Sequence, residues 1–145
     1  MNLSNFGETL KEMLNERNLT AKDFAKSINV SAPTITRYIR GERMPDINIL
    51  ILIADALNCS TDFLLGREPE NSTLKFKKCP PFPEQIVILA KMFGKDNNDF
   101  CSKIKIPESS FYEWKNGSSI PTLLSIENIA DKIDRRLDFV LGRES

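Results

Sequence analysis

The chain repeats itself, because residues 6–68 align with residues 82–144 at a constant offset of 76 without a gap. Sixteen of the 63 aligned pairs are identical, and six of these identities fall within the seven positions that end each copy, residues 62–68 and 138–144. A repeat of this length is a small domain, since the units of solenoids are about 20–50 residues long. The sequence therefore predicts a domain at residues 1–68, a linker at residues 69–81 and a second domain at residues 82–145.

The composition excludes several classes of site. The chain has no histidine, which rules out a Ser-His-Asp triad, a Cys-His dyad and every zinc site that contains histidine. Its three cysteines are odd in number and widely spaced, so neither a disulfide framework nor a CxxC metal site is expected. The acidic residues are scattered and are not gathered with a nucleophile and oxyanion donors. We therefore expect no metal, no cofactor and no enzymatic activity.

No part of the sequence has the pattern of a membrane segment. No apolar run approaches the roughly 18 residues of a membrane span, and the N-terminal residues lack the charged and apolar regions of a signal peptide. We expect a cytoplasmic protein.

Apolar residues recur at helical spacing in both copies. The first predicted helix carries Leu3, Phe6, Leu10, Met13 and Leu14. Four later helices are predicted to begin at Thr20, Ser31, Asp46 and Ser60, whose side chains can accept hydrogen bonds from the first free amides of a helix. No segment has the pattern of a strand. The sequence predicts an all-α chain built from two five-helix domains.

The second and third predicted helices of each copy are separated by about three residues, which is the helix-turn-helix arrangement. In the first copy, residues 19–25, 30–38, 41–45 and 54–65 closely resemble the Cro and lambda-repressor (XRE) family of helix-turn-helix domains. The second copy keeps scaffold residues such as Phe100, Phe111 and Trp114 and is similar to the same fold. The resemblance implies two tandem lambda-repressor-like DNA-binding domains.

The resemblance also implies that the third helix of the first copy reads bases with residues near its N-terminus. Arg37 can bind guanine O6 and N7, Thr34 can hydrogen-bond a base or a phosphate, and Ala32 can touch a thymine methyl group. Arg40, Arg43 and Lys22 are placed for phosphates. The alternative for the arginines is an ordinary solvated face. The predicted DNA-binding residues are Thr20, Ala21, Lys22, Ser31, Ala32, Pro33, Thr34, Arg37, Arg40 and Arg43.

The second copy differs at the positions that would read DNA. The offset of 76 places Glu113 opposite Arg37 and Asn116 opposite Arg40. Glutamate is repelled by phosphates, although it can accept a hydrogen bond from cytosine N4. The candidate DNA-binding residues here are Ser109, Ser110, Tyr112, Glu113, Lys115 and Asn116. Two roles stay open for this domain, namely DNA binding and assembly with a protein partner.

Net charge does not favour DNA binding, because 20 basic residues balance 20 acidic ones. Affinity should then require two modules or two subunits that act together, so a homodimer and an intramolecular pseudo-dimer both stay open. The fourth helix has more apolar surface than its own core needs. The extra apolar residues are predicted to form an interface, and they are Ile49, Ile51 and Leu52. Closer contact with the first helix or with the linker is the alternative.

We therefore predict a sequence-specific regulator of transcription that binds double-stranded DNA, as a bacterial or prophage repressor. Repression is favoured over activation because the sequence has no separate domain to recruit polymerase or to sense a sizeable ligand, an argument from family analogy. The alternative is a protein-binding adaptor or antitoxin-like module that uses the second domain for protein partners.

Overall fold

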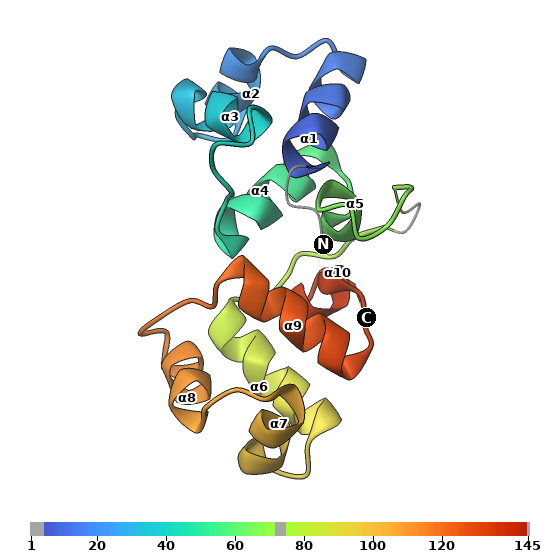
Figure 1. The fold of residues 1–145 in the computed structure, drawn as a ribbon. Coiled ribbons are helices and arrows are strands. Elements are labelled where there is room, and N and C mark those ends of the chain that lie inside the picture. Colours follow the sequence, from blue (N-terminus) through green and yellow to red (C-terminus); the bar gives the residue numbers. More distant parts are fainter. Residues whose placement is uncertain (1–4, 72–74, 145) are drawn as a thin grey trace. The chain divides into compact units, whose positions relative to one another are not determined.

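The computed structural model describes residues 5–71 and 75–144, and it divides into two compact units, Met1–Leu74 and Lys75–Ser145. Within the described residues there are ten helices and no strand (Figure 1). The prediction of an all-α chain is therefore confirmed for this part of the protein. Leu3, which was assigned to the first helix, lies outside the described residues.

The first unit consists of five short helices. They are α1 Asn5–Glu16, α2 Ala21–Ser27, α3 Ala32–Ile39, α4 Ile47–Leu57 and α5 Thr61–Leu64. Helix α1 packs against α3 and α5, α2 packs against α3, and α4 packs against α5. The apolar stripe predicted for the first helix is buried by these contacts at Phe6, Leu10, Met13 and Leu14.

Side-chain caps define where α2 to α5 begin. The caps are Thr20, Ser31, Asp46 and Ser60, and each accepts a hydrogen bond from the amide three residues further along the chain. A cap of this kind stabilises a helix by about 0.5–2 kcal/mol, because it satisfies an amide that has no partner within the helix. The four predicted starts are confirmed.

The second unit also consists of five helices. They are α6 Phe82–Phe93, α7 Asn97–Ile104, α8 Glu108–Asn116, α9 Leu123–Ile133 and α10 Leu137–Leu141. Their bounds equal those of α1 to α5 shifted by 76, to within one residue at every end. Helix α6 packs against α7, α8 and α10, while α9 packs against α7 and α10. The sequence repeat therefore corresponds to a repeat of helix lengths and connections.

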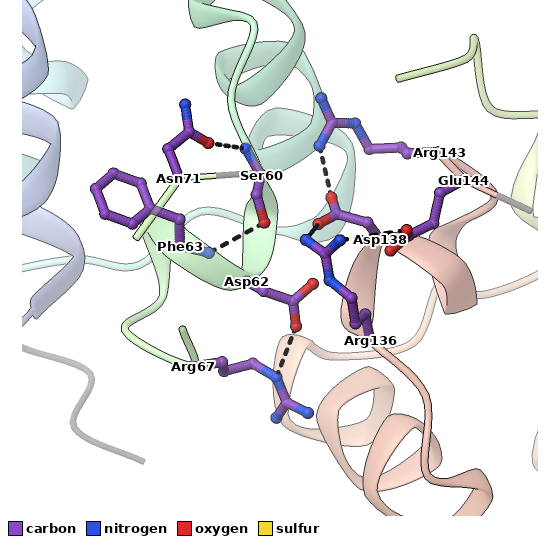
Figure 2. A network of polar contacts seen from close by, with 9 residues as sticks. All are labelled: Ser60, Asp62, Phe63, Arg67, Asn71, Arg136, Asp138, Arg143 and Glu144. Carbon is purple, nitrogen blue, oxygen red and sulfur yellow. Dashed lines mark hydrogen bonds and ion pairs between the residues drawn. The ribbon is translucent and has the colours of Figure 1, made fainter. Parts of the chain in front are cut away.

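Each unit ends in an ion pair that we call the Asp–Arg clasp (Figure 2). In the first unit, Arg67 Nε lies 3.1 Å from Asp62 Oδ1, and the Arg67 amide donates to the Asp62 carbonyl at 2.8 Å. In the second unit, Arg143 Nη1 lies 2.6 Å from Asp138 Oδ1, and the Arg143 amide donates to the Asp138 carbonyl at 2.8 Å. Both aspartates are buried, and Asp138 Oδ2 also accepts a hydrogen bond from Arg136 Nη2 at 3.2 Å, so its carboxylate is held by two guanidinium groups.

The two ends of the predicted linker are each bonded to the unit that they adjoin. Asn71 Oδ1 accepts a hydrogen bond from the Ser60 amide at 2.9 Å, within the first unit (Figure 2). The Lys77 amide donates to the Arg143 carbonyl at 2.8 Å, within the second unit. Residues 72–74, the middle of the predicted linker, lie outside the described residues.

Helix α1 approaches the end of α3 closely at Gly7. A Cβ atom at this position would lie 2.5 Å from the carbonyl oxygen of Tyr38 and 2.7 Å from that of Ile39. These are backbone atoms, which cannot rotate away, so only glycine allows the two helices to approach this far. Beside this contact, the rings of Phe6 and Tyr38 pack edge to face, with centroids 5.9 Å apart.

We expect Gly7→Ala to destabilise the first unit by about 1–3 kcal/mol, because the added methyl group overpacks the contact between α1 and α3. Helix propensity alone would give the opposite sign, since alanine is favoured over glycine by about 1 kcal/mol within a helix. Native-state hydrogen exchange of the α1 and α3 amides measures the change, with Lys11→Ala on the exposed face of α1 as control. Slower exchange in Gly7→Ala would contradict the close approach.

Candidate nucleic-acid interface

The turn between α2 and α3 is fixed by a left-handed residue. Asn29 has φ of 59°, its amide donates to the Lys26 carbonyl, and the Val30 amide donates to the Ala25 carbonyl at 2.9 Å. This is the Schellman pattern, which satisfies carbonyls at the end of a helix and sends the chain off at a defined angle. Asn29 was not predicted from the sequence, although asparagine is enriched in the left-handed region.

The first turn of α3 is tied together by hydroxyl groups. Ser31 Oγ accepts from the Thr34 amide at 3.3 Å and lies 2.6 Å from Thr34 Oγ1. Pro33 falls in this turn, where its missing amide costs no hydrogen bond. Two residues predicted to contact DNA, Ser31 and Thr34, therefore also hold the start of the helix in shape.

The two sides of α3 have different environments. Ile35 and Tyr38 are 0% and 3% exposed and form its buried side. Pro33 and Arg37 are exposed, and Ala32 is half-buried. Packing of the apolar side against the rest of the unit thus turns Arg37 toward solvent, while Ala32 and Thr34 are half-buried.

Three arginines follow one another along the exposed end of α3. Arg37 lies in its last turn, Arg40 caps its C-terminus, and Arg43 lies in the loop that follows. All three are exposed, and within the described residues none has a side-chain hydrogen bond or an ion pair. Burial raises the pKa of the nearby Tyr38 hydroxyl above its usual value, although the positive charge of Arg43 opposes this rise. The arrangement leaves three guanidinium groups available to an anionic partner.

The start of α2 lies one helix earlier in the motif. Thr20 Oγ1 accepts from the Asp23 amide at 3.0 Å and is therefore occupied as a cap. Lys22 is exposed and Ala21 is half-buried. Of the residues predicted here, Lys22 offers a free positive charge, but the carboxylate of Asp23 lies next to it in the sequence and is also exposed.

Helix α8 occupies the equivalent place in the second unit. Phe111 and Trp114 form its buried side, and Tyr112 is 43% exposed. The Lys115 ammonium lies 5.7 Å from the centroid of the Tyr112 ring. Of the other candidates, Ser109 and Asn116 are exposed and Ser110 is half-buried.

The charges at α8 differ from those at α3. Glu108 and Glu113 are exposed, and the Glu113 carboxylate accepts a hydrogen bond from the Ser119 hydroxyl at 3.3 Å. The N-cap of α8 is Pro107, which offers no side-chain hydrogen bond. The second unit thus presents carboxylates where the first unit presents guanidinium groups.

The residues predicted to form an interface on α4 are only partly covered. Leu52 is 39% exposed, while Ile49 and Ile51 are half-buried. Leu52 therefore exposes apolar surface, and the interface that would cover it stays a prediction.

Comparisons with known proteins agree with this geometry. A family profile described as helix-turn-helix matches residues 10–64, which run from α1 to the end of α5. The chain is 33% identical over 124 residues to the HTH-type transcriptional regulator ImmR of Bacillus subtilis (strain 168), a match that covers 70% of this chain and 98% of ImmR. It is 36% identical over 84 residues to the cryptic phage CTXphi transcriptional repressor RstR of Vibrio cholerae serotype O1, covering 52% of this chain and 75% of RstR.

A similarity to an enzyme is partial. The chain is 26% identical over 129 residues to methylphosphonate synthase of Nitrosopumilus maritimus (strain SCM1), covering 86% of this chain but only 24% of the synthase. No solved structure gives a significant match. Among the helices of the described residues, none is both long enough and apolar enough to cross a membrane.

The geometry of α2 and α3, the profile match over the first unit and the nearly full-length match to ImmR lead to one conclusion. The chain belongs to the helix-turn-helix family of transcriptional regulators.

Proposed function

We propose that the protein is a repressor that binds specific sequences of double-stranded DNA through α3 of its first unit. The observation that carries this proposal is the solvent-facing side of α3, where Arg37 projects opposite the buried Ile35 and Tyr38. An arginine at this place can form two hydrogen bonds with guanine in the major groove. The name of RstR, a transcriptional repressor, supports repression over activation.

The rest of the site supplies contacts to the backbone of the duplex. We infer that Arg40, Arg43 and Lys22 bind phosphates, because each is exposed and carries a positive charge close to α3 or at the start of α2. Thr20, Ala21, Ser31, Ala32, Pro33 and Thr34 complete the proposed contact surface. Ser31 and Thr34 act there partly through their mutual hydrogen bond, which orients both hydroxyl groups.

We also infer that the second unit is a diverged copy of the first, with a weaker role in DNA binding. The equal helix bounds support common descent, and the carboxylates of Glu108 and Glu113 support a change of role. A second candidate function for α8 is to hold a protein partner, in the manner of an adaptor. The match to methylphosphonate synthase covers a quarter of that enzyme, so it supports no catalytic role for this chain.

The identity of the bases read by α3 is tested by Arg37→Ala in the full chain. We expect the dissociation constant for the best duplex to rise roughly 5- to 150-fold, the equivalent of about 1–3 kcal/mol, because two hydrogen bonds to guanine are lost. Fluorescence anisotropy with the best duplex and with duplexes changed at single positions measures this effect. Lys11→Ala, which removes one positive charge from α1, is the matched control and should leave the affinity unchanged.

The proposal for Arg37 requires a change in specificity as well as in affinity. Discrimination at one or two base positions should relax in Arg37→Ala. An equal loss for every duplex would place Arg37 at a phosphate, and unchanged binding would remove α3 from the interface.

Phosphate contacts are tested by measuring how the DNA affinity of Arg43→Ala depends on ionic strength. Binding should weaken to a similar degree for all duplexes, and the slope of the logarithm of affinity against the logarithm of salt should fall by about one, because one fewer counterion is released. Titrations at several salt concentrations measure the slope. A slope equal to that of the unmodified protein would exclude Arg43 from the contact.

The role of α8 is tested by Glu113→Ala. If α8 does not touch DNA, affinity and sequence preference should both stay unchanged. A loss of preference for cytosine at one position would instead show that the Glu113 carboxylate accepts a hydrogen bond from cytosine N4.

A further inference from the structure

The second unit holds an extended segment of its own chain against the turn that follows α10. The Phe76 ring lies 4.2 Å from the guanidinium carbon of Arg143, at cation–π distance, and the Lys77 amide donates to the Arg143 carbonyl at 2.8 Å. A Cβ atom on Gly142 would lie 2.8 Å from Pro80 Cδ, so Pro80 sits directly on this glycine. The second unit thus contacts the segment in three ways. The Arg143 guanidinium group contacts the aromatic ring, the Arg143 carbonyl accepts from the Lys77 amide, and Gly142 leaves room for Pro80.

The first unit has a pocket of about 450 Å³ at the corresponding place, between α1 and the turn that follows α5. Three of its lining residues match positions of the second unit that touch or adjoin the docked segment. At the offset of 76 these pairs are Thr9 and Gln85, Gly66 and Gly142, and Arg67 and Arg143. The volume lies within the range of about 300–1,000 Å³ that is usual for binding pockets.

The backbone around the pocket repeats that of the occupied site. Gly66 has φ of 74° and Gly142 has φ of 88°, a left-handed conformation that suits glycine in both turns. The Asp–Arg clasp holds both arginines beside the turn, through Nε in Arg67 and through Nη1 in Arg143. Local structure that holds a peptide segment in one unit is therefore present in the other.

The charge of the pocket indicates what could fill it. Glu8, Glu12 and Glu68 contribute to its lining, and both glutamates of α1 are exposed. The segment docked on the second unit follows its aromatic residue with Lys77 and Lys78. A peptide of that chemistry would place an aromatic ring in the pocket and lysines beside the three carboxylates.

We propose that this pocket binds an extended segment of a protein partner, with an aromatic residue followed by lysines, in the way the second unit holds residues 76–80. The site lies on α1 and after α5, and it uses no residue assigned to DNA. It would give the regulator a contact for a protein partner that is separate from α3.

A peptide that copies residues 75–81, with Cys79→Ser, tests the proposal when it is titrated into the full chain. We expect saturable binding, with amide shifts in nuclear magnetic resonance spectra at Thr9, Gly66 and Arg67. Phe76→Ala in the peptide should weaken binding roughly 10-fold or more, because the aromatic ring supplies most of the apolar contact.

Two protein variants provide a matched pair. Glu12 lines the pocket, and Glu16, one turn later on α1, does not. Glu12→Lys should weaken peptide binding roughly 3- to 10-fold through charge reversal at an exposed pair, whereas Glu16→Lys should leave it unchanged. Duplex affinity should be the same in both variants, so a failure of this proposal is distinct from a failure of DNA binding by α3.

Several outcomes would overturn the proposal. These are a lack of saturable binding, amide shifts confined to another surface, and equal affinity in Glu12→Lys and Glu16→Lys. Peptide binding that appears only after removal of residues 2–4 would assign the pocket to the chain's own N-terminal residues. Self-association that Glu12→Lys abolishes would assign it to a second copy of the chain.

Discussion

The close packing of α1 against α3 determines what the first unit can present to a partner. Gly7 lets the two helices meet at their backbones, and the edge-to-face contact of Phe6 with Tyr38 fills the space beside them. Because Ile35 and Tyr38 are held inside by this contact, Arg37 can only face outward. A helix of eight residues has little stability of its own, so its orientation depends on this packing more than on its propensity.

Local features of the fold could be predicted from the sequence, and contacts between distant segments could not. The caps at Thr20, Ser31, Asp46 and Ser60 depend on amides three residues away, so the sequence pattern was sufficient to locate them. The approach at Gly7 involves residues more than thirty positions apart, and a glycine within a helical stripe has no pattern that reveals its neighbour.

The same limit applies to the candidate sites. The exposure of Arg37 follows from helical spacing once the buried side of α3 is known. The hydrogen bond between the hydroxyl groups of Ser31 and Thr34 could not be predicted from the sequence, because either hydroxyl could have turned to solvent. The docking of Phe76 on Arg143 was not predicted either, since residues 69–81 were interpreted only as a linker.

The two units have the same helix pattern but different surfaces. Helix bounds and the Asp–Arg clasp repeat at the offset of 76, and these features determine the fold of each unit. The exposed side of the third helix carries Arg37 in one unit and Glu113 in the other, and this difference affects what each surface can bind. Function therefore has to be argued from each surface separately, because a shared fold does not imply a shared partner.

Selection of duplexes from a random pool tests most directly whether α3 of the first unit reads DNA. The full chain, its Arg37→Ala variant and a Lys115→Ala variant in α8 would be compared under the same salt concentration. If α3 reads the bases, the full chain and Lys115→Ala will enrich the same motif, and Arg37→Ala will lose preference at one or two positions within it. A motif that depends on Lys115 but not on Arg37, or no enrichment by the full chain, would contradict it.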